Sequence, residues 1–422
     1  MFASSFRILP FLVLTSFAAA GGLEREIILA PQAGAEREDT DIRRWQERAG
    51  TADAKAESYE QLGWAFVAKA RRTLDAGYYK LAEKSAEAME AQFGASAESR
   101  LLRGNVLHNL HRFRESETVA RGLAAERGQP EDFGLLSDAL MEQGRLTEAV
   151  EALQRMVNLK PGAAAYSRIA HVRWLKGDLP GAIAAMEMAA RASRPEDGEP
   201  YAWMLARLSG FYLQTGEPGR AWQVADSAGR LVPSYPPALL ARGRALLALG
   251  NNAAAIEALQ RAAGLNPLPE YQWWLADALR AARRDDEAAK VEAELRARGE
   301  AADPRTFALF LATRGREAPT AVRLAREELA NRADVFTHDA VAWTLAAAGD
   351  FAAAEEPMRA ALAEHTQEAR LFFHAGEIAL ARGAGAEAAH FFAQARPLAA
   401  ALTPSERARL EAQAAAIVAR AN

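Results

Sequence analysis

The sequence predicts an all-α solenoid, a superhelix of about ten helix–turn–helix repeats, and three observations predict it. A phrase such as "GLLSDALMEQGRLTEAVEALQRMVNLKP" at 134–161 recurs about every 34 residues. Within each phrase the apolar residues follow the helical period of about 3.6 residues. A glycine marks the turn between the two helices, and a proline often follows the second. One helix pair cannot bury its own apolar stripe, so the pairs must stack on one another.

The period is measured from the small residue near the start of each second helix. Successive spacings between these residues are 34, 33, 33, 39, 34, 33, 33, 33 and 34, and the extra residues of the long interval fall in the polar segment "RPEDGEP" at 194–200. So regular a spacing over ten units predicts one continuous solenoid. The ten residues are Ala82, Ser116, Ala149, Ala182, Ala221, Ala255, Ala288, Ala321, Ala354 and Ala388.

The phrase at 134–161 shows why each unit should fold as a helix pair. Leu136 and Leu140 are spaced to lie on one helical stripe, and Gly144 can end that helix because glycine adopts positive φ at little cost. The small Ala149 lets the two helices approach closely. Pro161 stops the second helix because its nitrogen cannot donate a backbone hydrogen bond.

The pattern resembles the tetratricopeptide repeat (TPR) family, whose phrase is W-x2-L-G-x2-Y…A-x3-F…P over 34 residues. In the unit that ends at Pro267, Gly243, Leu246, Ala255 and Leu259 fall at the family's spacing. The resemblance covers about residues 57–400 and implies a right-handed superhelix whose first helices line the concave surface. Gly63 precedes Ala82 by 19 residues instead of the usual 12, which predicts a longer first helix in the first unit.

The two ends of the chain differ from the repeats. The run "ILPFLVLTSFAAA", with the A-x-A site at 18–20, predicts a signal peptide cleaved near Ala20 and hence an exported protein, with an uncleaved anchor as the alternative. We expect a flexible lead and an N-terminal capping helix over 21–56, the TPR superhelix over 57–402 and a C-terminal capping helix over 403–422. Thr403 and Glu406 are spaced as a capping box for that last helix.

Composition and motifs argue against several classes of function. The formal net charge is −4, from 51 basic and 55 acidic residues, which is no footprint for nucleic acid. The chain has no cysteine, and it lacks the H-E-x-x-H, P-loop and G-x-S-x-G motifs. His108 and His111 could share a helical face, but no third metal ligand lies near them in the sequence. We therefore expect no enzyme, no metal and no cofactor.

Carrying over the family's register predicts which side chains face the concave groove. Aromatic and arginine side chains gather at these positions in units four to seven, the composition of an interaction hot spot. A one-residue error in the register would bury several of them. The predicted groove residues are Arg168, His171, Trp174, Trp203, Arg207, Arg244, Trp273, Trp274, Asp277, Arg280 and Trp343.

The favoured interpretation is a non-enzymatic scaffold or adaptor of the cell envelope that grips an extended segment or helix of another protein in this groove. A polysaccharide-handling protein is the alternative, because stacked tryptophans also suit sugar rings. A self-associating array is the third interpretation. The Lys and Asn set of chaperone-tail clamps is absent, so the motif does not name the partner.

Overall fold

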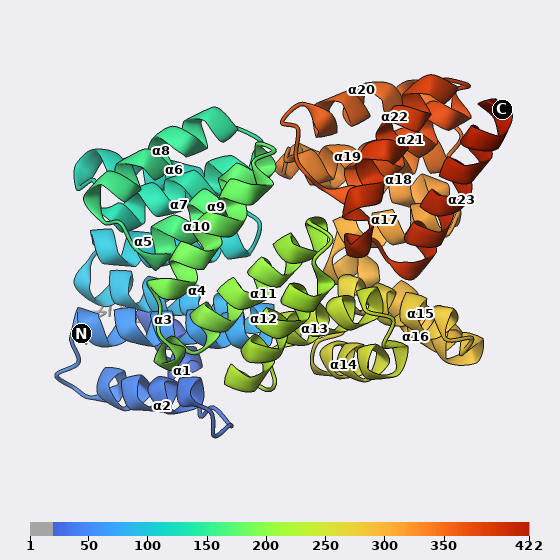
Figure 1. The fold of residues 1–422 in the computed structure, drawn as a ribbon. Coiled ribbons are helices and arrows are strands. Elements are labelled where there is room, and N and C mark those ends of the chain that lie inside the picture. The colour runs from blue at the N-terminus through green and yellow to red at the C-terminus, as the bar shows by residue number, and fades with distance from the viewer. Residues whose placement is uncertain (1–19, 422) are drawn as a thin grey trace, which may run out of the picture.

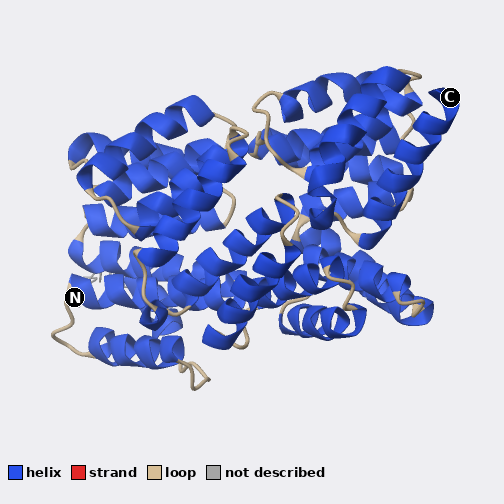
Figure 2. Cartoon of the chain, in the orientation of Figure 1, coloured by secondary structure: helices blue, strands red, loops and turns tan. Residues whose placement is uncertain are grey.

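The computed structural model describes residues 20–421, and within them every regular element is a helix (Figure 2). The predicted signal peptide lies outside the described residues except for Ala20. Ten helix pairs follow one another along the chain and confirm the predicted all-α solenoid (Figure 1). They are α3 (Ala56–Thr73) with α4 (Ala76–Phe93), α5 (Ala97–Asn109) with α6 (Phe113–Glu126), α7 (Pro130–Glu142) with α8 (Leu146–Leu159), α9 (Ala163–Leu175) with α10 (Leu179–Arg191), α11 (Glu199–Gln214) with α12 (Pro218–Leu231), α13 (Pro236–Ala248) with α14 (Asn252–Leu265), α15 (Pro269–Ala281) with α16 (Asp285–Ala302), α17 (Pro304–Thr313) with α18 (Ala318–Asn331), α19 (Val335–Ala347) with α20 (Phe351–Leu362), and α21 (Ala369–Ala381) with α22 (Gly385–Ala395).

The small residues that define the period explain why the pairs pack so regularly. All ten, from Ala82 to Ala388, have 0% exposed surface. In nine of the ten pairs this residue is the fourth of its helix, so each pair has its closest approach at the same place. The exception is the first pair, whose two helices both have 18 residues. Its first helix is thus longer than those of the later pairs, as the spacing predicted.

The N-terminal segment is the part of the chain expected to hold a flexible lead and a capping helix. It forms two helices, α1 (Ala20–Leu29) and α2 (Arg37–Gly50), with Ile28 fully buried against the first pair. The Gln46 side chain donates to the carbonyl of Ile28 at 2.7 Å, and Arg25 donates to the carbonyl of Gly50 at 2.9 Å. These bonds fix α1 on α2, which the composition of 21–36 did not indicate.

The C-terminal helix α23 (Pro404–Ala421) follows a 3-10 turn, η2 (Arg396–Ala401). The capping box is present: the Thr403 amide donates to the Glu406 carboxylate at 3.0 Å, and the Glu406 amide donates to the Thr403 hydroxyl at 3.4 Å. Besides α22, the helix contacts α15, where the Ser405 hydroxyl donates to Asp277. It therefore joins two distant parts of the superhelix in addition to covering the last pair.

The superhelix closes on itself, which the repeat pattern did not predict. The turn between α9 and α10 lies against the loop 363–368 of the C-terminal units (Figure 1). The Trp174 indole donates to the Gln367 carbonyl at 3.0 Å, the Thr366 hydroxyl donates to the Leu175 carbonyl at 2.6 Å, and Lys176 pairs with Glu364 at 2.8 Å. In a simple solenoid each repeat contacts only its neighbours, so these contacts close a ring.

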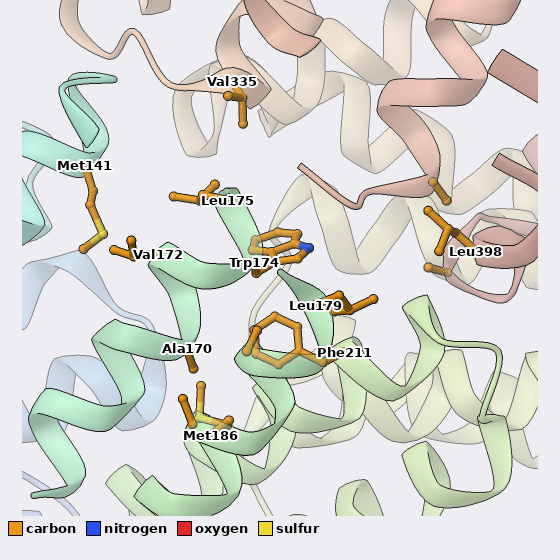
Figure 3. Packing of buried hydrophobic residues seen from close by; sticks show 14 of the residues in the cluster. Met141, Ala170, Val172, Trp174, Leu175, Leu179, Met186, Phe211, Val335 and Leu398 are labelled. Atoms are coloured by element: carbon orange, nitrogen blue, oxygen red, sulfur yellow. The ribbon is translucent and has the colours of Figure 1, made fainter. Parts of the chain in front are cut away.

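Further contacts extend this closure to α6 and α7, which precede α9. Arg332, after α18, pairs with Glu142 of α7, and Arg114 of α6 donates to the carbonyl of Ala330 at 2.8 Å. Apolar packing accompanies these polar contacts: the rings of Trp174 and Phe336 stack with their centroids 5.3 Å apart. Figure 3 shows Trp174 between residues of α9–α11 and Val335 of α19. Both turn backbone and buried side chains therefore hold the ring closed.

A matched pair of glycine substitutions tests the closure. Gly177 and Gly250 end equivalent first helices with φ of +80° and +77°, so alanine at either costs about 1–2 kcal/mol in backbone strain. Only at Gly177 would the added Cβ meet the closing loop, 2.7 Å from the His365 carbonyl; at Gly250 nothing lies within 4 Å. We expect Gly177→Ala to increase the radius of gyration in small-angle scattering, and Gly250→Ala to leave it unchanged. Equal radii for the two variants would contradict the closure.

Candidate functional site: the central cavity

Closure leaves a central cavity of about 250 Å³ on the inner side of the ring. The first helices of seven successive repeats, α9 to α21 in steps of two, contribute its walls. Ligand pockets usually measure about 300–1,000 Å³, so this space is smaller than a groove for a long peptide or a helix. The lining side chains that bear on its chemistry are Trp174, Arg207, Phe211, Gln214, Arg244, Glu270, Trp273, Trp274, Arg305, Leu309, Phe336, Asp339, Glu368 and Arg370.

Three arginines of the cavity each lie over a tryptophan ring. Their guanidinium carbons are 5.5 Å from the ring of Trp174 for Arg207, 4.8 Å from that of Trp274 for Arg244, and 4.9 Å from that of Trp273 for Arg370. Such cation–π contacts fix the guanidinium planes while leaving their N–H groups available to an acceptor.

Two of the cavity arginines are neutralised by carboxylates. Arg370 forms a two-pronged pair with Glu406 of α23 at 2.9 and 3.1 Å, and Arg305 pairs with Asp334 at 2.9 Å. The Arg370 guanidinium holds the pKa of Glu406 below its usual range, against the raising effect of burial. Because both partners of each pair are committed, these two arginines serve the structure of the wall.

Arg207 and Arg244 lack such partners: among the described residues no carboxylate lies within 4.0 Å of either. Arg207 contacts His171 Nδ1 at 3.3 Å, and Arg244 donates only to the Ala401 carbonyl at 3.3 Å. Burial lowers the pKa of both guanidinium groups, and their pKa remains lowered although Glu270 and Glu368 act to raise it. An arginine stays protonated in proteins, so these are two incompletely compensated positive charges.

Five of the eleven predicted groove residues line the cavity, namely Trp174, Arg207, Arg244, Trp273 and Trp274. The tryptophans differ from the expected exposed wall. Trp273 is 1% exposed, and Trp174 and Trp274 are also buried. Ring closure covers Trp174 through its contact with Phe336, whereas Trp273 and Trp274 are buried in the cores between neighbouring repeats.

Other predicted groove residues are committed to contacts within the chain. Arg168 forms a two-pronged pair with Asp138 at 2.8 and 2.6 Å, and Trp203 is half-buried between neighbouring repeats. Trp343 is buried, stacks on His374 with centroids 4.0 Å apart, and donates to the Thr313 hydroxyl at 3.0 Å. Each of these side chains is therefore satisfied without a ligand.

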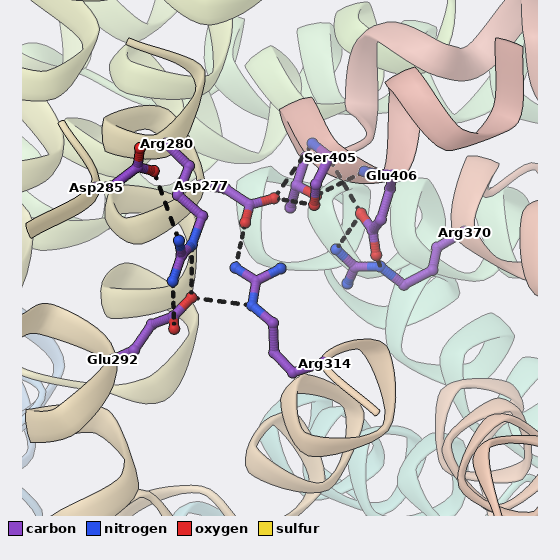
Figure 4. A network of polar contacts seen from close by, with 9 residues as sticks. Asp277, Arg280, Asp285, Glu292, Arg314, Arg370, Ser405 and Glu406 are labelled. Carbon is purple, nitrogen blue, oxygen red and sulfur yellow. Dashed lines mark hydrogen bonds and ion pairs between the residues drawn. The ribbon is translucent and has the colours of Figure 1, made fainter. Parts of the chain in front are cut away.

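Asp277 and Arg280 belong to a polar network that fastens the C-terminal helix (Figure 4). Asp277, 1% exposed, accepts from Arg314 of α17 and from Ser405 of α23. Arg280 pairs with Glu292 at 2.8 Å. The network joins α15, α16, α17 and α23, so both residues hold the ring together and neither lines the cavity.

Several cavity residues were missed by sequence reasoning although a signal for them existed. Glu270, Phe336 and Arg370 each occupy the second position of their unit in the family's register, which is a groove position. Reading that position systematically would have found all three. Glu368 lies in a loop and Arg305 at a core position of the register, so no register reading would have placed them here.

Neither a metal centre nor a membrane span is found in the described part of the chain. Over residues 20–421, no three His, Cys, Asp or Glu side chains are close enough to share a metal ion. None of the helices in this range combines the length and the apolar character needed to cross a bilayer.

The chain matches one family model, and several solved structures resemble it. A family model described as tetratricopeptide repeat matches residues 135–197 and 240–304. No curated protein sequence matches the chain. Solved structures that resemble it include MamA (20% identity, 39% of this chain and 94% of MamA, TM-score 0.32), PilF of Pseudomonas aeruginosa (15%, 51% and 97%, 0.40) and a human IFIT1 dimer with PPP-AAAA (12%, 90% and 94%, 0.49).

The environment of His171 predicts how stability depends on pH. Burial, followed by the Arg207 charge, lowers the pKa of His171 to about 4, below the value of about 6.5 expected in the unfolded chain. The unfolded state therefore binds the proton more readily, and stability should fall as the pH decreases from about 6.5 through 4. We expect His171→Gln to reduce the loss of stability between pH 7.5 and pH 5, measured by urea unfolding. The exposed His390→Gln is the control, and identical profiles for the two variants would contradict this assignment.

Proposed function

Since this chain is a tetratricopeptide-repeat protein, we propose that it is a non-enzymatic scaffold of the cell envelope that holds a short segment of a protein partner in the central cavity. Protein interaction is the role that these repeats support in general. The single observation that carries the proposal is the convergence of first helices from seven repeats on one cavity with uncompensated guanidinium groups.

The size of the cavity changes what the partner can present. An extended segment or helix along units four to seven, the sequence-based expectation, needs an open groove, and closure leaves only about 250 Å³. A segment of one or two residues fits this space. We therefore propose that one or two residues of the partner enter the cavity. The rest of the partner segment would lie along the rim of the cavity.

The polysaccharide alternative has less support from the geometry. Sugar rings bind to aromatic side chains through exposed ring faces. Here the rings of Trp174, Trp273 and Trp274 each carry an arginine, and Trp343 stacks on His374. With these faces occupied, the aromatic set offers little stacking surface to a glycan.

The envelope location rests on the signal-like N-terminus. A fusion of the full chain to alkaline phosphatase, which is active only outside the cytoplasm, tests it. We expect phosphatase activity from the full-length fusion and none when residues 2–20 are deleted. Equal activities from both fusions would overturn the export proposal.

A site-specific crosslinker tests the partner. The chain has no cysteine, so one introduced thiol gives a single attachment point. Gly210 lines the cavity, and a Cβ there meets nothing within 4 Å; Gly264, on α14 outside the cavity, has the same free space. We expect a photo-crosslinker on Gly210→Cys to capture a defined envelope protein and the same reagent on Gly264→Cys to capture none. Identical adducts, or no adduct from the cavity position, would overturn partner binding in the cavity.

A further inference from the structure

Four charged side chains face the cavity without an ion-pair partner among the described residues. Two are the guanidinium groups of Arg207 and Arg244, and two are the carboxylates of Glu270 and Glu368. One Glu368 oxygen accepts from the Gln214 side chain and the other from the Arg370 amide at the start of α21, and each can accept one further hydrogen bond. The cavity thus presents unpaired charges of both signs.

The rest of the wall is apolar. Phe211, Leu309 and Phe336 line it between the charged groups. At about 250 Å³, just below the usual range of ligand pockets, the cavity is on the scale of a small molecule. A ligand that matches this wall is small, carries one carboxylate and one ammonium group, and has an apolar body.

We propose that the cavity binds a small zwitterion, a free α-amino acid with an apolar side chain. Its carboxylate accepts from Arg207 and Arg244. Its ammonium group donates to Glu270 and Glu368, and its side chain packs on Phe211 and Phe336. The inference concerns the cavity of the proposed function, and it stands without a protein partner. The termini of a very short peptide offer the same two charges and are the second source of this chemistry.

Such a ligand would bridge parts of the ring that are far apart in sequence. Arg207 and Arg244 lie on α11 and α13, whereas Glu368 precedes α21 and belongs to the closing loop 363–368. Binding would therefore add contacts across the closure. Ligand that binds only the closed ring shifts the population toward it, in proportion to the difference in affinity.

Isothermal titration of the full chain with L-phenylalanine tests the inference. The two single-charge analogues, 3-phenylpropionate and phenethylamine, separate the contributions of the charges. We expect phenylalanine to bind at least tenfold more tightly than either analogue. The dipeptide Ala-Phe distinguishes the sources, because tighter binding than that of phenylalanine assigns the site to the ends of a short peptide. No heat from phenylalanine or the dipeptide, or equal affinities for the analogues, would overturn the proposal.

Variants assign the two ends of the ligand. Arg207→Gln with Arg244→Gln should weaken phenylalanine binding at least tenfold, whereas the exposed pair Arg191→Gln with Arg359→Gln, which makes the same charge change, should not. Glu270 is exposed, so Glu270→Gln preserves the fold. The Glu270→Gln substitution should weaken phenylalanine binding and leave 3-phenylpropionate binding unchanged. Unaltered phenylalanine affinity in both cavity variants would overturn the assignment.

The two proposals can fail separately. Binding of phenylalanine without any protein adduct at Gly210→Cys would overturn the scaffold function and keep the zwitterion site. A protein adduct without binding of phenylalanine or the dipeptide would support the scaffold function and overturn the zwitterion site.

Discussion

The contact between the turn after α9 and the loop 363–368 is the constraint on which the rest of the structure depends. It joins Trp174, Leu175 and Lys176 to a segment nearly 190 residues later through two hydrogen bonds and an ion pair. Without it the first helices would line an open groove. With it they surround a small cavity, Trp174 is covered, and Arg207 and Arg244 are left half-buried without a carboxylate partner.

Closure also explains how the charges are distributed. Arginines that fasten the wall are paired with carboxylates, as Arg370 is with Glu406 and Arg314 with Asp277 (Figure 4). Arg207 and Arg244, which are half-buried, have no carboxylate partner, and an unpaired charge that is partly removed from water lowers stability. Charged groups that lower the stability of the fold and hold no part of it together indicate a ligand site. The cavity is thus a region where charged groups from several repeats meet without ion-pair partners.

The sequence was sufficient to predict the features that recur within each repeat. Ten small residues at constant spacing specified ten helix pairs, because each pair meets only through positions that recur within its own unit. Ring closure was not predictable in the same way. Gly177 has the same role in its own turn as Gly250, yet only Gly177 lies against the His365 carbonyl. That difference depends on the accumulated twist of six repeats, which no single unit encodes, and it decides whether Trp174 is covered.

The most direct measurement of the account is the distance across the closure in solution. Lys176 and Glu364 are 2.8 Å apart at their charged ends, and the chain has no cysteine of its own. In the double variant Lys176→Cys with Glu364→Cys, a short bismaleimide should join the two thiols rapidly within one monomer, and Lys176→Cys with Arg359→Cys should not react in this way. Failure of the first pair to crosslink, with helical content retained, would show that the solenoid is open and would contradict the cavity.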